Sequence, residues 1–174
     1  MKALRVLLAD LSATAAVEMA LVTPLLVILM FGSMELGNYF LDQHAVSKQV
    51  NDGARFAARL PLASTYNCPA AVYEDSGATT KIVNVTKTGS VDGTATGRFP
   101  AAFWDACGDG DAVTVTMRCV DKTLYKGVYT GLAGNIPVVK VSADVAYPSL
   151  FGAVGFATSA LCLRATSEAA VVGL

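Results

Sequence analysis

The sequence is poor in the residue types on which most enzyme sites depend. It contains one histidine, His44, and its cysteines form no Cys-x-x-Cys pair. Without a second histidine we expect neither a zinc site nor a Ser-His-Asp triad, and the signal for redox catalysis is weak. No glycine-rich phosphate loop follows a predicted strand. We therefore expect no catalytic residues, no metal and no cofactor.

Charge is also scarce, and neither sign dominates. Lys and Arg number 13 against 14 Asp and Glu, so the formal net charge is −1. Nucleic-acid binding requires a basic face, and we therefore expect no nucleic-acid partner. The acidic segment at residues 105–111 (DACGDGD) lacks the spacing of an EF-hand. We interpret it as a turn with solvated carboxylates.

What the chain has in excess is apolar sequence near its N-terminus. Hydrophobic residues make up 53% of the chain, and the mean hydropathy is +0.49. Residues 19–34 contain no charge, and apolar residues beyond Glu18 and Glu35 lengthen the run at both ends. The combined stretch exceeds the roughly 20 residues that cross a bilayer as a helix. We predict one transmembrane helix over residues 14–41.

The charges that flank this run predict its orientation. Lys2 and Arg5 precede it and Asp42 follows it, so the positive-inside rule places the N-terminus in the cytoplasm and the rest in the periplasm.

The length of the run argues against a buried helix of a soluble fold. A cleaved secretory signal peptide would have an apolar stretch of about 7–15 residues before a small-residue site, and no Ala-x-Ala follows here. We predict a single-pass inner-membrane protein.

Glu18 interrupts the apolar run near its start. An acidic group in a membrane span costs on the order of 3 kcal/mol unless it is paired or hydrated. Glu18 is therefore either a functional charge or a carboxylate that reaches water at the cytoplasmic interface. Glu35 lies about 26 Å further along the helix, which favours the opposite interface. Pro24 removes one backbone donor and predicts a kink, which either a packed neighbour or an isolated helix can accommodate.

Beyond the membrane, the helix is predicted to continue over residues 42–60, with Gly53 as its weakest point and Pro61 as its stop. Residues 61–174 form the outer domain. Its fold class is α+β: the long N-terminal helix continues into a small antiparallel β-sheet. Strands are expected at residues 79–88, 113–119, 139–147 and 159–170. A short helix at residues 99–104 is expected to cap the core. Residues 149–157 form an apolar link that lies on the membrane surface or seals the core.

All four cysteines, Cys68, Cys107, Cys119 and Cys162, lie beyond the apolar run. An even number on one side of a membrane predicts two disulfides in an oxidising compartment. Spacing alone permits three arrangements, of which we favour Cys68–Cys107 with Cys119–Cys162. The second bridge has a difficulty, because Cys119 falls on the apolar face of its strand and Cys162 on the polar face of its own.

Three motifs near the N-terminus form a recognisable pattern. Residues 13–26 read ATAAVEMALVTPLL, residues 35–37 read ELG, and residues 52–58 read DGARFAA. Together they resemble TadE-like proteins, the minor pilins or pseudopilins of the tight-adherence (Flp) pilus machinery. The resemblance is close over the first third of the chain and looser in the C-terminal third.

The resemblance implies a processing step. A prepilin peptidase would cut between Ala13 and Thr14, remove the cytoplasmic leader of residues 1–13, and leave Glu18 as the fifth residue of the mature chain. The new α-amine of Thr14 would then pair with Glu18 of a neighbouring subunit, so that each charge offsets the burial cost of the other. This chain has Ala13 where the family generally has Gly.

The resemblance also implies a function and a pilin-like fold. We expect a minor pilin that takes part in assembly, priming or capping of the fibre, with the inner membrane, the prepilin peptidase, other minor pilins and the major Flp-type pilin as partners. A type II secretion pseudopilin is a near neighbour, but residues 14–18 (TAAVE) depart from its Thr-Leu-Ile/Val-Glu motif. The alternative is a membrane-anchored periplasmic binding module that is neither cleaved nor incorporated in a fibre.

Overall fold

The chain divides into two compact units, Met1–Tyr39 and Phe40–Leu174. A computed structural model describes residues 11–68, 70–104, 107, 110–124, 127, 129–130, 134–154 and 161–173. Helix α2 (Leu11–Arg59) supplies all the described residues of the first unit and the first helix of the second. The long helix predicted from the sequence is therefore confirmed, and it ends just before Pro61 as expected.

The second unit contains a three-stranded antiparallel sheet with strand order β3-β4-β5. Its strands are β3 (Val113–Val120), β4 (Ile136–Ala146) and β5 (Cys162–Ala170). One face is buried, because side chains two residues apart share a face and the odd-numbered valines of β4 are 0% exposed. The predicted α+β class and three of the four predicted strands are confirmed.

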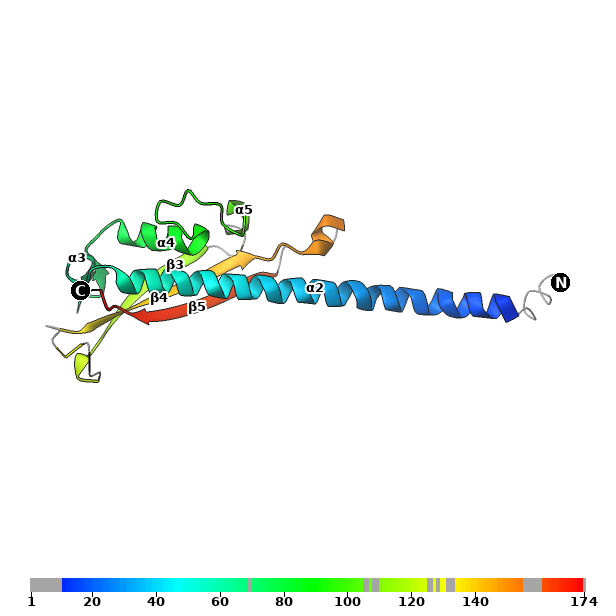
Figure 1. Cartoon of the computed structure of the whole chain (residues 1–174), viewed down its shortest axis with the longest axis horizontal. Helices are drawn as coiled ribbons and strands as arrows, with labels where there is room; N and C mark the ends of the chain where they lie inside the picture. The colour runs from blue at the N-terminus through cyan, green and yellow to red at the C-terminus, as the bar shows by residue number, and fades with distance from the viewer. Residues whose placement is uncertain are drawn as a thin grey trace. The chain divides into compact units, whose positions relative to one another are not determined.

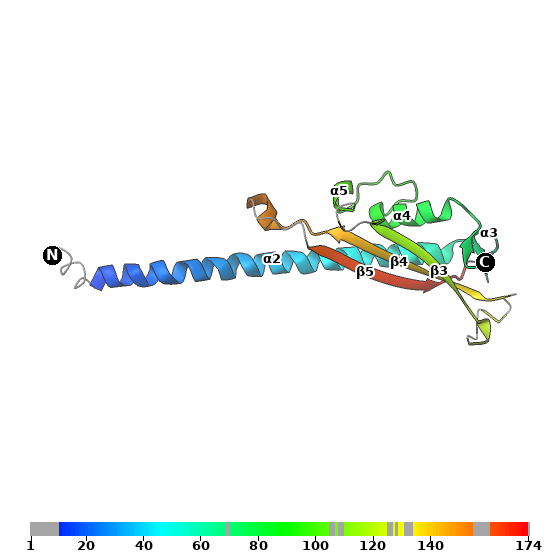
Figure 2. The same cartoon turned by 180° about the vertical axis from the view of Figure 1, so that it is seen from behind.

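The second half of α2 covers the buried face of this sheet (Figures 1 and 2). Val46, Val50, Ala54 and Ala57 are at most 1% exposed and recur at helical spacing. Polar bonds also join the helix to β5, one before the stripe and one in its middle. Gln43 Nε2 donates to the carbonyl oxygen of Arg164 at 2.7 Å, and Ser167 Oγ lies 2.7 Å from Asn51 Oδ1.

The strand predicted over residues 79–88 is wrong, because this segment forms helix α4 (Ala78–Thr88). Its β-branched residues favoured a strand, but the local signals of a helix prevail. Asp75 accepts a hydrogen bond from the Gly77 amide at 2.8 Å and pairs with Lys81 at 3.0 Å, and both bonds lower the pKa of the Asp75 carboxyl. Gly89 closes the helix in the left-handed conformation, with φ 77°.

Gly53 allows α2 and α4 to approach closely. A Cβ atom at this position would lie 2.0 Å from Thr86 Oγ1 and 3.2 Å from Thr86 Cβ. Thr86 is fully buried, and its hydroxyl donates to the carbonyl oxygen of Ile82. Gly53 is therefore not merely a weak point of the helix, as its low helix propensity indicated, but the contact that brings two helices together.

Short elements close the ends of the second unit. The rings of Tyr66 and Tyr73 pack in a tilted arrangement in the small hairpin, with centroids 5.6 Å apart. Burial raises the pKa of both phenols, that of Tyr73 to about 12. Phe99 and Trp104 pack edge to face with ring centroids 6.2 Å apart, which confirms the predicted core-capping helix. The short elements are α3 (Leu62–Thr65), β1 (Tyr66–Asn67), β2 (Val72–Tyr73), α5 (Ala101–Trp104), η1 (Lys122–Leu124) and η2 (Leu150–Val154).

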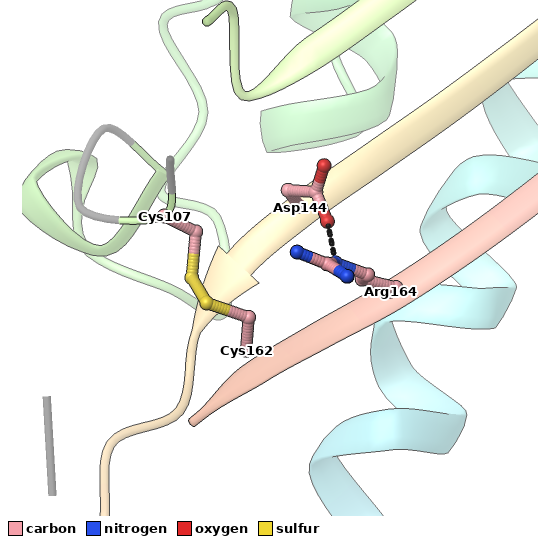
Figure 3. Close-up of a disulfide and its surroundings, with 4 residues drawn as sticks. All are labelled: Cys107, Asp144, Cys162 and Arg164. Carbon is pink, nitrogen blue, oxygen red and sulfur yellow. Dashed lines mark hydrogen bonds and ion pairs between the residues drawn. A yellow bond between two sulfur atoms is a disulfide. The ribbon is translucent and has the colours of Figure 1, made fainter. Parts of the chain in front are cut away.

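All four cysteines form disulfides, but the pairing favoured from the sequence is wrong. The bridges are Cys68–Cys119 and Cys107–Cys162, with Cα–Cα distances of 5.8 and 6.1 Å. The register explains the difference, because Cys119 lies opposite Pro137 and Cys162 opposite Ala146, at the two ends of β4. Nine residues of strand separate those partners by about 30 Å. Figure 3 shows Cys107 reaching the start of β5.

We predict that Gly53→Ala destabilises the second unit by about 1–3 kcal/mol, because the new methyl group overlaps the Thr86 side chain. Gly37→Ala is the matched helical control, since apart from the local backbone of its own helix no atom lies within 4 Å of its added Cβ. Denaturation of the full chain in detergent, followed by the fluorescence of Trp104, measures both. Adding Thr86→Ala to Gly53→Ala should recover part of the loss. Equal midpoints for Gly53→Ala and the parent would contradict the close contact.

Candidate membrane-spanning and processing segment

The first half of α2 has the surface of a membrane span. Its large apolar residues are exposed on every side of the helix; Leu21 and Ile28, for example, are 74% and 69% exposed. The most apolar window of Thr14–Arg59 has a mean hydropathy of 2.1, and none of it is buried within the chain. A core helix of a soluble protein would bury such a surface. This single N-terminal helix is therefore the feature of a membrane-anchored, single-pass protein.

Thr14 and Glu18 lie one helical turn apart near the start of this surface. Both are exposed, and residues four apart lie on the same side of a helix. Because helical side chains lean toward the N-terminus, Glu18 points toward the turn that contains Thr14. Among the described residues, none makes a hydrogen bond or ion pair with the Glu18 carboxylate. The Ala13–Thr14 peptide lies within α2, close to its beginning at Leu11.

Pro24 lies inside α2, and the helix continues through it. Its missing amide hydrogen leaves the carbonyl group of Ala20 without the usual donor. One residue earlier, Thr23 Oγ1 donates to the carbonyl oxygen of Met19 at 2.6 Å, so side-chain and backbone bonding are both altered in this turn. The kink itself stays a prediction.

Asp42 has a role that the sequence did not reveal. It was interpreted as a flanking charge at the membrane boundary, yet its side chain is 5% exposed and accepts hydrogen bonds from the Arg98 guanidinium, with Nε at 3.1 Å. Arg98 also lies over the Phe99 ring. No local sequence motif predicts this ion pair, because Asp42 and Arg98 are 56 residues apart in the sequence. Asp42 thus ties the beginning of the second unit to its core.

The remaining polar candidates do not gather into a site. His44 is exposed on α2. Within the ranges that the structure describes, no three His, Cys, Asp or Glu side chains are grouped as metal ligands would be. Asp105 and Asp109 of the acidic segment lie outside those ranges, as does the segment of residues 1–10 that contains Lys2 and Arg5.

A comparison with known protein families agrees with a membrane-anchored, single-pass protein. Residues 13–55 match the family model of TadE-like proteins. The resemblance stated from the sequence motifs is thereby confirmed for this part of the chain, which begins at Ala13 and includes Glu18 and Pro24. The match covers less than half of the chain and ends before the outer domain. No curated protein and no solved structure matches the chain.

We predict that Arg98→Gln destabilises the second unit by about 1–3 kcal/mol, because it leaves the Asp42 carboxylate buried without a cation. Arg118→Gln is the matched control. Arg118 is 58% exposed against 53% for Arg98, but its partner Glu168 is 41% exposed, so its loss should cost less than about 1 kcal/mol. Chemical denaturation of the full chain gives both values.

A double-mutant cycle separates the ion pair from the contact between Arg98 and Phe99. In an Asp42→Asn background, the cost of Arg98→Gln should fall below about 1 kcal/mol, since the buried charge is gone. An unchanged cost in that background would assign the effect to the aromatic contact instead.

Proposed function

We propose that this protein is a minor pilin, or pseudopilin, that takes part in assembly, priming or capping of a tight-adherence pilus after a prepilin peptidase has removed residues 1–13. The protein would act as a structural subunit and not as an enzyme. Its partners would be the inner membrane, the peptidase, other minor pilins and the major Flp-type pilin, with the outer domain in the periplasm until assembly.

The observation that carries this proposal is the match of residues 13–55 to the TadE-like family, over a helix whose apolar surface is exposed on all sides. A helix of this kind needs lipid around it in the membrane. In a fibre it needs other helices, which would bury the same side chains. The same apolar surface therefore suits the subunit both in the membrane and in the fibre.

Glu18 supplies the electrostatic part of the proposal. Cleavage after Ala13 creates an α-amine at Thr14, which is a cation at neutral pH. The Glu18 carboxylate of an adjoining subunit is a suitable partner for that cation, because a charge-assisted hydrogen bond between two desolvated groups offsets part of the cost of burying each. Pairing of this kind would draw subunits together with their helices side by side.

The second unit supports a minor role over a major one. It is a folded α+β unit with two disulfides and a closed core of its own. A subunit that polymerises in many copies needs little beyond its helix, whereas a subunit at the tip or base of a fibre has space for a larger domain. The size of the domain that follows residue 60 therefore favours a minor subunit.

One observation favours the second candidate function. Ala13 stands before the expected cleavage bond where the family generally has Gly, and an uncut chain would be a membrane-anchored binding module that never enters a fibre. Intact mass and N-terminal sequencing of the protein from membranes distinguish the two candidates.

We predict that the mature chain begins at Thr14 and that the full-length mass returns when the prepilin peptidase is deleted. Ala13→Gly should be cut at least as completely as the parent, and Ala13→Leu should stay uncut, because a peptidase site built for a small residue excludes the larger side chain. A mature chain that still begins at Met1 would remove the pilin hypothesis.

We also predict that Glu18→Gln lowers piliation at least about tenfold, a loss on the order of 1.4 kcal/mol per assembly step, because the neutral amide cannot pair as strongly with the amine. Glu35→Gln is the control in the same helix and should assemble normally. Counting pili by electron microscopy in a strain that lacks the native gene measures both. Normal piliation with Glu18→Gln would contradict a role for this charge.

A further inference from the structure

We infer that the second unit has its own lipid-binding surface, which begins at the last residues of the predicted membrane span. This surface, called here the apolar rim, consists of Phe40, Leu41, Leu150, Phe151 and Leu161, and its partner is the interfacial region of the lipid bilayer. The inference requires the membrane span but not cleavage or entry into a fibre.

The rim lies where the chain leaves the membrane span. Leu41 is the last residue of the apolar run, and Gln43, two residues later, donates to the carbonyl oxygen of Arg164 at 2.7 Å. Tyr147 and Leu161 form the last backbone bond of the β4–β5 ladder, with N···O 2.9 Å. The connection between these strands therefore starts beside the first residues of the helix in the second unit. Covalent continuity alone brings this end of the unit to the bilayer surface.

The large apolar residues at this end are exposed. Leu41 is 65%, Phe40 54%, Leu161 49% and Leu150 44% exposed. Among the described residues of the second unit, the other large apolar residues with comparable exposure are valines, namely Val72, Val91 and Val172. Exposed leucine and phenylalanine of the second unit thus concentrate near Phe40, the residue at which the chain continues into the span. Their exposure to water would be unfavourable, and their insertion among lipid headgroups favourable.

The connection between β4 and β5 carries no charge of its own. Residues 145–163 contain no Asp, Glu, Lys, Arg or His. Asp144 and Arg164 bracket this stretch and pair with each other across the sheet, with Nε to Oδ1 2.7 Å (Figure 3). The charges therefore end at the base of the connection. An uncharged connection avoids the cost of bringing a charge into the apolar part of a membrane.

The base of the connection is held firmly enough to present these side chains. The Cys107–Cys162 disulfide fixes the first residue of β5 (Figure 3). The Phe151 amide donates to Ser149 Oγ at 3.1 Å, which initiates η2. Helix η2, drawn in orange, projects from the end of β4 beyond the sheet (Figures 1 and 2). Lipid is favoured over a second protein chain because Phe40 and Leu41 are also the last residues of the apolar run that a bilayer would cover.

Tryptophan fluorescence in vesicles tests this inference. The parent has one tryptophan, Trp104, which is 2% exposed and gives the baseline. Leu150→Trp adds a reporter at the rim. Val172→Trp is the control: Val172 is 48% exposed, and its amide bonds to Ala58, about 22 Å along α2 from Gln43. The full chain is reconstituted at high lipid-to-protein ratio in phosphatidylcholine with or without brominated acyl chains.

We expect the added tryptophan at position 150 to emit at shorter wavelength and to be quenched by the brominated chains at least about twofold more than that at position 172, because an interfacial side chain contacts the upper acyl region. Equal quenching at the two positions would overturn the inference. A blue shift of Leu150→Trp that occurs only in assembled pili would also overturn it and assign the rim to a neighbouring subunit. Circular dichroism and non-reducing electrophoresis verify that both variants fold with their disulfides.

Discussion

One helix in this protein meets two different environments, and the rest of the structure depends on that change. In the first unit, α2 exposes apolar side chains on all sides, so it requires a partner as apolar as lipid. In the second unit, the same helix buries a single stripe, Val46 to Ala57, against a sheet. The stripe contributes to a core that folds within the chain, whereas the exposed surface is left for whatever surrounds it.

The change of environment explains the placement of the polar groups around it. Asp42 follows the apolar run directly, and its burial against Arg98 ties the first turn of the folded unit to the loop that follows α4. Gln43 reaches β5 from the next position. The unit is therefore held to the helix from its first residues, and the apolar rim lies at the same end.

Sequence patterns were sufficient wherever one local property dominated. The span was evident from its long apolar run, the end of α2 from Pro61, and β3 from its strand-forming pattern. They failed where long-range geometry decides. In α4, β-branched residues favoured a strand, while the bonds of Asp75 and the left-handed Gly89 stabilise a helix. The disulfide pairing failed because spacing contains no strand register, and register puts Cys119 and Cys162 at opposite ends of the sheet.

The sequence by itself determined that this chain has one apolar helix with an acidic residue near its start, a TadE-like N-terminal segment, and an α+β domain with two disulfides. These features follow from composition, periodicity and short motifs, which act between neighbouring residues. Only the tertiary structure decided that Gly53 is a helix contact, that Asp42 is a buried ion pair, and that exposed leucines gather at one end of the sheet. Each of these depends on residues far apart in the chain, whose proximity arises when the core packs.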